Sequence, residues 1–266
     1  MKRLSNITFI LYFFVILIPI YAQEAVPNMK KSFDAFQKDR QEKHSLTDEQ
    51  KSIMNNANIQ LDKINPDPGL KSSTKAPNFI LPNAFGENVE LYEELKKGPV
   101  ILVFYRGAWC PFCNIQLQTL QKSLPHFKKH NASLIAISPQ KPEFSIGQIE
   151  KDQLQFQVLS DLDYEVIKAY NLFFELPPDL NELYITKFQL DITKFNGENR
   201  IGLPIPGTLV IGEDAIIVTS FAEVDYKKRM EVSSIIDYLE AYEFAEPLRK
   251  FEQSIKPKKM KVINNS

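Results

Sequence analysis

Two kinds of apolar pattern run along the chain and predict an α/β domain. Continuous apolar runs, such as PVILVFY at 99–105 and SLIAIS at 133–138, are typical of strands buried on both faces of a sheet. Further along the chain, four apolar residues from Leu117 to Phe127 recur at spacings of three, four and three, which predicts the buried face of a helix. Because strands and helices alternate, the pattern favours a layered α/β fold.

Shorter segments complete the expected domain. We expect, in chain order, two short strands in 76–91, a short helix in 92–98, a strand in 156–161, a helix in 165–170, an antiparallel hairpin in 207–221 and a closing helix in 233–242. Residues 172–203 contain prolines and show no clear period, so we expect an irregular segment there.

The first 22 residues read as a secretory signal peptide. A basic start is followed by sixteen uncharged residues that end at the small residue Ala22, and this run is shorter than the roughly 20 residues that a membrane span needs. The alternative, an uncleaved anchor, is weakened by Pro19 and by the same shortness. We therefore expect an exported protein, periplasmic or extracellular, that contacts a membrane only if the signal is not cleaved.

The rest of the chain divides into three expected parts. Residues 23–69 are polar, with scattered apolar positions that predict one or two surface helices ended by NPDPG, and 70–243 form the main domain. Residues 244–266 form a basic tail, which is more often a solvated end than a binding site. The net charge of −1 gives no reason to expect a nucleic acid partner.

Cys110 and Cys113 are the only cysteines, and they lie between a predicted buried strand and a predicted helix. The unpaired N–H groups of a helix N-terminus stabilise a thiolate, and the second cysteine of such a pair can attack a disulfide or sulfenic acid formed on the first. A purely structural crosslink is less favoured, because closing so short a loop contributes roughly 2 kcal/mol, against ~4.7 kcal/mol for a hundred-residue loop.

A metal site is the alternative interpretation of the same cysteines. Cys110, Cys113, His126 and His130 have the spacing of a two-Cys, two-His zinc finger. The helical period leaves no room for the hairpin of a finger, and Ser123 stands where its small core needs an apolar residue. We expect both histidines to be exposed and no metal to bind, while a zinc- or disulfide-stabilised interaction module remains the non-enzymatic alternative.

The cysteine segment ILVFYRGAWCPFC resembles the thioredoxin superfamily, and the wider pattern is similar to one branch of it. KAPNFILPNAFGENVEL, LPIPGTLVI and VDYKKRME match peroxiredoxin-like proteins of the alkyl hydroperoxide reductase/thiol-specific antioxidant family that carry a Cys-x-x-Cys, over about residues 70–240. The resemblance implies a thioredoxin-like fold, a central mixed sheet flanked by helices, with an N-terminal helical extension. It also implies a redox-active disulfide between Cys110 and Cys113, no other cofactor, and a thioredoxin-like reductant.

Two mappings of the cysteines follow from the resemblance. Aligned with thioredoxin, Cys110 is the exposed nucleophile and Cys113 the resolving thiol, and the substrate is a protein disulfide. Pro206, two residues before Thr208, then resembles the cis-proline that docks the substrate backbone. Phe104 stands where that family would place a buried acid to accept a proton.

Aligned with peroxiredoxins, Cys113 takes the peroxidatic position and the substrate is a hydroperoxide. The family's proline is then replaced by Arg106 and its threonine by Cys110, and we expect its later arginine to be lost near Pro206. Arg106 could lower a thiol pKa or be an ordinary surface charge, and Trp109 could act in the active site or only cover the end of the strand. This mapping predicts an exported thiol peroxidase, slow because groups that bind peroxide are missing, with a general thiol-disulfide oxidoreductase as the alternative.

Overall fold

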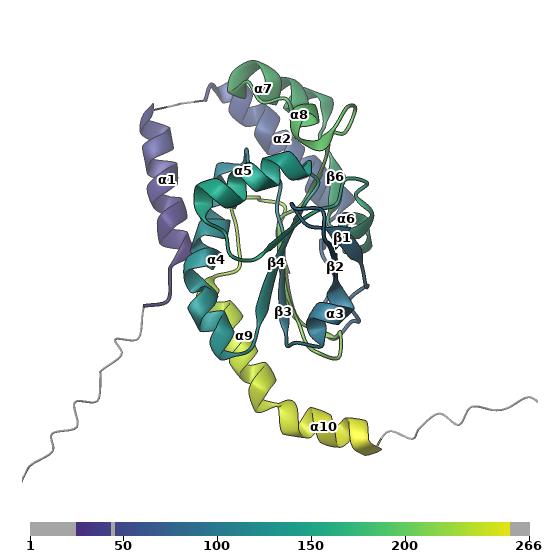
Figure 1. Cartoon of the computed structure of the whole chain (residues 1–266). Coiled ribbons are helices and arrows are strands. Elements are labelled where there is room, and N and C mark those ends of the chain that lie inside the picture. The colour runs from purple at the N-terminus through teal and green to yellow at the C-terminus, as the bar shows by residue number, and fades with distance from the viewer. Residues whose placement is uncertain (1–24, 44–45, 256–266) are drawn as a thin grey trace, which may run out of the picture.

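The computed structural model describes residues 25–43 and 46–255, and its centre is a five-stranded mixed sheet in the order β5-β4-β3-β8-β9 (Figure 1). The five strands are β3 Val100–Phe104, β4 Ser133–Ser138, β5 Gln157–Ser160, β8 Gly207–Ile211 and β9 Ile217–Ala222. β3, β4 and β5 run parallel, while β8 pairs antiparallel with both β3 and β9. The predicted thioredoxin-like mixed sheet is confirmed, and the run predicted to be buried on both faces is its middle strand.

Helices cover one face of this sheet, and a hairpin with two short helices lies on the other. The first layer holds α4 Pro111–Lys129, α5 Pro142–Asp152 and α9 Val232–Phe244, and the second holds β1 Ile80–Pro82, β2 Asn88–Glu90, α3 Leu91–Leu95 and α6 Glu165–Ala169. Alternate residues of β3 serve the two layers: Ile101 and Val103 pack with α4, while Val100, Leu102 and Phe104 face the hairpin. This double burial is why the β3 sequence is apolar throughout.

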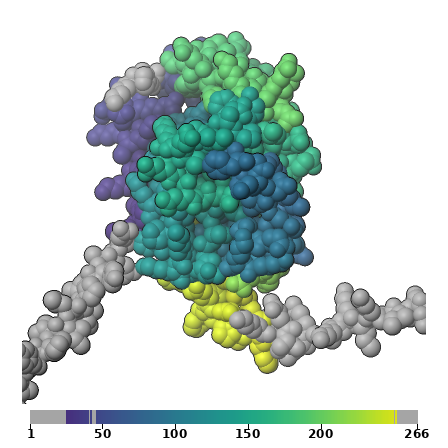
Figure 2. Space-filling view, viewed as in Figure 1, coloured from purple at the N-terminus to yellow at the C-terminus, as the bar shows by residue number. Residues whose placement is uncertain are grey.

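The N-terminal extension forms α1 Met29–Lys43 and α2 Asp48–Ile64, as predicted, but these helices are more than a surface decoration. On α1, Met29 and Phe33 are buried in the cluster that contains both cysteines. The Phe33 and Phe36 rings lie 5.5 and 5.3 Å from the ring of Phe112. In Figure 2, α1 (purple) runs along one side of the molecule, while α10 (yellow) projects at the lower end. Helix α1 of the extension therefore covers the start of α4.

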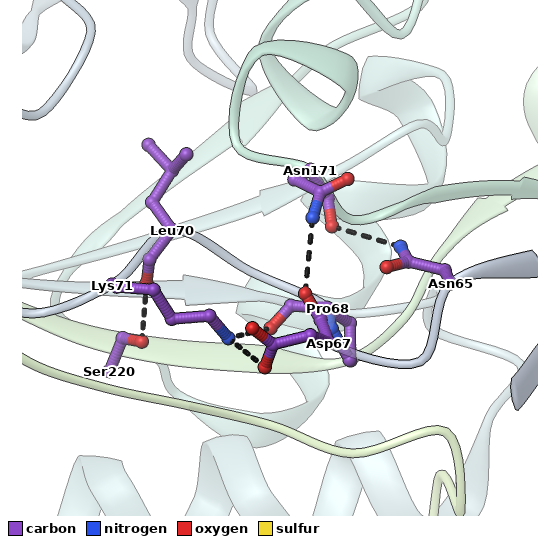
Figure 3. A network of polar contacts seen from close by, with 7 residues as sticks. All are labelled: Asn65, Asp67, Pro68, Leu70, Lys71, Asn171 and Ser220. Carbon is purple, nitrogen blue, oxygen red and sulfur yellow. Dashed lines mark hydrogen bonds and ion pairs between the residues drawn. The ribbon is translucent and has the colours of Figure 1, made fainter.

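The segment that joins α2 to the domain is fastened by a polar network (Figure 3). Asn171 donates to the carbonyl of Asp67 at 3.2 Å, and its own carbonyl accepts from Asn65 at 3.3 Å. Ser220, on β9, donates to the carbonyl of Leu70 at 2.5 Å. These bonds attach the segment to two separate parts of the domain. They therefore fix the place at which the chain passes from α2 into the domain.

The segment 172–203, expected to be irregular, is ordered into short elements. They are β6 Phe173–Glu175, α7 Pro178–Phe188, α8 Ile192–Asn196 and β7 Gly202–Pro204. The expectation was wrong because Pro178 stands at the first position of α7, where a proline begins a helix instead of breaking it. The tail likewise begins with a helix, α10 Glu246–Ile255. The predicted signal peptide lies outside the described residues, and no helix within those residues is long and apolar enough to cross a membrane.

The two histidines of the zinc-finger alternative lie in different surroundings at the end of α4. His126 is buried on α4, with 6% of its surface exposed, so the prediction that it is exposed was wrong. His130 is half-buried and lies 3.0 Å from Glu243 of α9. No group of three or more metal-ligating side chains gathers anywhere in 25–43 or 46–255. The apolar stripe of α4 is wider than the spacing predicted, which brings His126 into the interface.

We expect His126→Ala to lower the free energy of unfolding by about 1 to 2 kcal/mol, because it removes a buried side chain. The matched variant His130→Ala should change it by about 0.5 kcal/mol or less, since its pairing lies near the surface. Urea unfolding of both proteins measures the difference. Equal effects of the two substitutions, or stoichiometric zinc in the purified protein, would contradict this assignment.

Candidate active site

The cysteines lie where β3 ends and α4 begins. Cys110 is the N-cap residue of α4, and its backbone N–H donates to the carbonyl of Gly107 at 3.0 Å. Gly107 has φ +144, and a Cβ there would come 2.5 Å from Nε1 of Trp109, so the turn requires a glycine. The N–H of Ala108 donates to Oε1 of Gln140 at 2.7 Å. The loop that presents the thiols is therefore held by both backbone and side-chain bonds.

Both cysteines are free thiols and both are buried, with 1% of Cys110 and none of Cys113 exposed. The prediction of an exposed Cys110 was wrong, because Phe112 and the helix α1 close over the start of α4. Two buried sulfur atoms cannot reach a second folded protein without rearrangement. The arrangement as it stands admits only small reactants.

The two thiols differ strongly in acidity. Burial disfavours the Cys113 thiolate, but a hydrogen bond from Cys110 and the charges of Arg229 and Arg106 outweigh it and lower the pKa of Cys113 to about 6. Burial, followed by the neighbouring Cys113, raises the pKa of Cys110 well above its usual value. Cys113 therefore holds the thiolate, and Cys110 stays a protonated thiol beside it.

Arg229, in the loop between β9 and α9, is the residue that the sequence analysis missed. Its Nη2 lies 3.7 Å from Sγ of Cys113, its Nε donates to Oε1 of Gln116 at 2.8 Å, and its Nη1 donates to the carbonyl of Tyr226. In the sequence no arginine stands next to Pro206, as expected, and the cation beside Cys113 comes instead from a later part of the chain. Arg229 belongs to the segment VDYKKRME. Because it lies 116 residues from Cys113 in the sequence, no local pattern predicts the contact.

Arg106 lies in an aromatic cage beside the cysteines. Its Cζ is 4.6 Å from the ring centre of Tyr226, 4.8 Å from that of Trp109 and 5.6 Å from that of Tyr184, whose hydroxyl accepts from Nη2. Burial alone would lower the pKa of Arg106. The electrostatic interactions of the guanidinium with Tyr184, Cys110 and their neighbours outweigh burial and leave this pKa raised. The Nε atom is buried without a hydrogen-bond partner. Arg106 is thus a permanent buried cation next to the thiols.

The remaining two expected residues take different places. The hydroxyl of Thr208 accepts a hydrogen bond from Nε2 of Gln116 at 3.3 Å, and Gln116 in turn accepts one from Arg229. Thr208 therefore supports the site through Gln116. Pro206 is buried, but the described residues contain no cis peptide bond, so the cis-proline expectation was wrong. It borders an apolar cavity of about 320 Å³ that also touches Arg106. Of the predicted residues, Arg106 and Trp109 line the same cavity as Cys110, whereas Thr208 contacts Gln116 and Pro206 lines the apolar cavity.

Known proteins with similar sequences carry the same kind of chemistry. The model of the AhpC/TSA family matches residues 73–220. Peroxiredoxin Bcp of Escherichia coli is 34% identical over 106 residues, which cover 40% of this chain and 67% of that protein. The thiol-disulfide oxidoreductase ResA of Halalkalibacterium halodurans is 30% identical over 103 residues, or 38% of this chain and 57% of that protein.

Solved structures agree on the fold. Peroxidoxin BcpB from Mycobacterium tuberculosis superposes with a TM-score of 0.51 at 20% identity, covering 65% of this chain and 97% of that one. A cysteine mutant of peroxiredoxin 6 of Arenicola marina gives 0.54 at 16% identity, covering 67% of this chain and 76% of that one. At such identities the likeness establishes the thioredoxin-type architecture alone.

The fold, the buried dithiol and these relatives define a thiol oxidoreductase of the peroxiredoxin class. The family model covers more than half of the chain, and the protein belongs to the AhpC/TSA family.

Proposed function

We propose that this protein is a thiol peroxidase in which Cys113 attacks the hydroperoxide and Cys110 resolves the product. The observation that carries the proposal is the guanidinium of Arg229, held by Gln116 with Nη2 3.7 Å from Sγ of Cys113. A thiolate is the nucleophilic form of cysteine, and a fixed cation beside Sγ favours it. The peroxiredoxin mapping of the cysteines is thereby favoured over the thioredoxin mapping.

The reaction proceeds in two balanced steps. The Cys113 thiolate attacks the terminal peroxide oxygen, the O–O bond breaks, and the leaving alkoxide takes a proton to become an alcohol while Cys113 becomes a sulfenic acid. The Cys110 sulfur then attacks the Cys113 sulfur, a disulfide forms and water leaves. After a local rearrangement that exposes this disulfide, a thioredoxin-type dithiol restores the two thiols and is itself oxidised to a disulfide.

Burial of the thiols favours hydroperoxides over protein disulfides as substrates. A hydroperoxide is small enough to enter a second cavity, also of about 320 Å³, which touches Cys110, whereas a folded protein that carries a disulfide is not. A general disulfide reductase is the competing function, supported by the Cys-x-x-Cys spacing and by the relative ResA. One experiment distinguishes the peroxidase activity from the disulfide reductase activity.

The test compares both substrates on the same pre-reduced protein. Stopped-flow oxidation by hydrogen peroxide and by a disulfide-bonded model protein should give a second-order rate constant for peroxide that is at least tenfold the larger. Loss of two thiols per chain, measured by titration, should accompany peroxide reduction. Faster reaction with the protein disulfide would overturn the peroxidase assignment in favour of disulfide reduction.

We further propose that the protein is exported. The short apolar run ending at Ala22 supports removal of the leader, so the mature chain is expected to begin near Gln23. N-terminal sequencing of the protein recovered from its native host checks this. A chain that retains Met1 in the membrane fraction would contradict it.

A further inference from the structure

Two adjoining chambers lead from the surface to Cys110. The inner chamber, of about 320 Å³, is bordered by Cys110 and Arg106. The outer chamber, of about 540 Å³, is bordered by Lys51 and Lys227. The walls of both include Arg40 of α1 together with Met54, Phe112 and Tyr226. Because Lys51 is exposed, the outer chamber meets solvent, and Arg40 stands at the passage between the two.

All the charged residues that line these chambers are cationic. They are Arg40, Lys51, Arg106 and Lys227, and no Asp or Glu of the described chain joins them in the lining. Two of the four are neutralised from outside: Lys51 lies 3.0 Å from Asp48, and Lys227 lies 3.8 Å from Asp225. A chain with net charge −1 thus surrounds its reactive thiols with positive charge.

Arg40 and Arg106 have no carboxylate within ion-pair distance among residues 25–43 and 46–255. Arg106 has its faces against aromatic rings and acts at the sulfur atoms. Arg40 is farther out, with Cζ 5.3 Å from the ring centre of Phe188, which belongs to the inner chamber. A half-buried guanidinium gains most from an anion that it can bind by two parallel hydrogen bonds.

Apolar side chains form much of the inner wall between the cations, with Gln189 among them. Met54, Phe112, Phe188 and Leu190 line the inner chamber, and neither end of it carries negative charge. A ligand that fits this arrangement has a short apolar body with a carboxylate at one end. Because the cations form a path that narrows toward Cys110, such an anion is also attracted into the chambers at long range.

We propose that the substrate is an organic hydroperoxide bearing a carboxylate, and that Arg40 binds this carboxylate while the peroxide group lies beside Cys110, one helical turn from Cys113. The inference rests on the proposed peroxidase function and adds its substrate class. Arg40 lies on the N-terminal extension, outside the 73–220 segment matched by the family. The extension therefore determines substrate specificity and also covers the start of α4.

The test uses a matched pair of probes: a tertiary alkyl hydroperoxide that ends in a carboxylate, and the methyl ester of the same compound. Oxidation of the pre-reduced protein is followed at low salt. A single turnover is measured, so the rate does not depend on a reductant. We expect the acid to react about tenfold faster than the ester, and we expect this ratio to fall as salt rises. Arg40→Gln should reduce the ratio to about one, and Arg40→Lys should restore part of it.

Lys38→Gln is the matched control, because it removes the same charge from an exposed position on the same helix. Its acid-to-ester ratio should equal that of the unmodified protein. Equal rates for acid and ester in the unmodified protein, or a preference that survives Arg40→Gln, would overturn the inference and leave the peroxidase function standing. Failure of every hydroperoxide, including hydrogen peroxide, would overturn the proposed function itself.

Discussion

Replacing Cys113 by Ser is expected to lower the rate constant for hydrogen peroxide by about 1,000-fold or more, because a hydroxyl cannot replace the thiolate nucleophile. Cys110→Ser is expected to retain the first oxidation at a rate within about tenfold of the unmodified protein, since the Arg229 cation beside Cys113 remains. Without a resolving thiol the variant should stop after one turnover. Stopped-flow fluorescence or peroxide consumption by each reduced variant gives these rates.

The two serine variants also control for each other. Both replace one buried sulfur by oxygen in the same turn of the same helix, so a general loss of folding would affect them alike. Near-UV circular dichroism confirms that each is folded. If Cys110→Ser lost the first oxidation and Cys113→Ser kept it, Cys110 would be the peroxide-reactive thiol and the thioredoxin mapping would hold.

Removing the cation beside the sulfur is expected to produce the second large effect. In Arg229→Gln, Cys113 loses one of the charges that lower its pKa but keeps the hydrogen bond from Cys110 and the charge of Arg106, so the pKa should rise from about 6. At pH 7 a thiol with the lower pKa is mostly thiolate, whereas an ordinary thiol with a pKa near 8.5 is only about 3% ionised, so the rate should fall by up to roughly 30-fold. The loss should shrink as pH rises through 8.5, because both proteins then become fully ionised.

The pH profile distinguishes this electrostatic role from a structural one. The unmodified protein should gain rate as pH rises through about 6 and then level off, while Arg229→Gln should continue to gain up to about 9. Lys228→Gln, a neighbouring exposed charge paired with Glu223, should keep the unmodified profile. An Arg229→Gln rate that is low at every pH would contradict the pKa assignment.

The sheet and the helix that carry the thiols could be predicted from the sequence because their signals are local. The apolar run at 99–105 and the spacing after Leu117 predict β3 and α4, and both are found. The resemblance likewise led to the mixed sheet and to the two competing cysteine mappings. Residues adjacent in sequence to the cysteines, Arg106 and Trp109, could therefore be named in advance.

The rest of the site depends on contacts between distant segments, which no local pattern records. Arg229 reaches Cys113 from a loop after the last strand, and Tyr184 reaches Arg106 from a helix in a segment expected to be irregular. The burial of Cys110 is due to α1, whose polar sequence predicted only a surface helix. The few apolar positions of α1 are the ones that close the site, and their target is set by the tertiary fold.

The most direct test of the central claim locates the sulfenic acid. One equivalent of hydrogen peroxide is added to the reduced Cys110→Ser variant in the presence of dimedone, and the labelled peptide is identified by mass spectrometry. The account predicts the adduct on Cys113, formed readily at pH 7 because Arg229 and Arg106 still lower the pKa of this thiol in the variant. Absence of that adduct, together with rapid labelling of Cys110 in the Cys113→Ser variant, would contradict it.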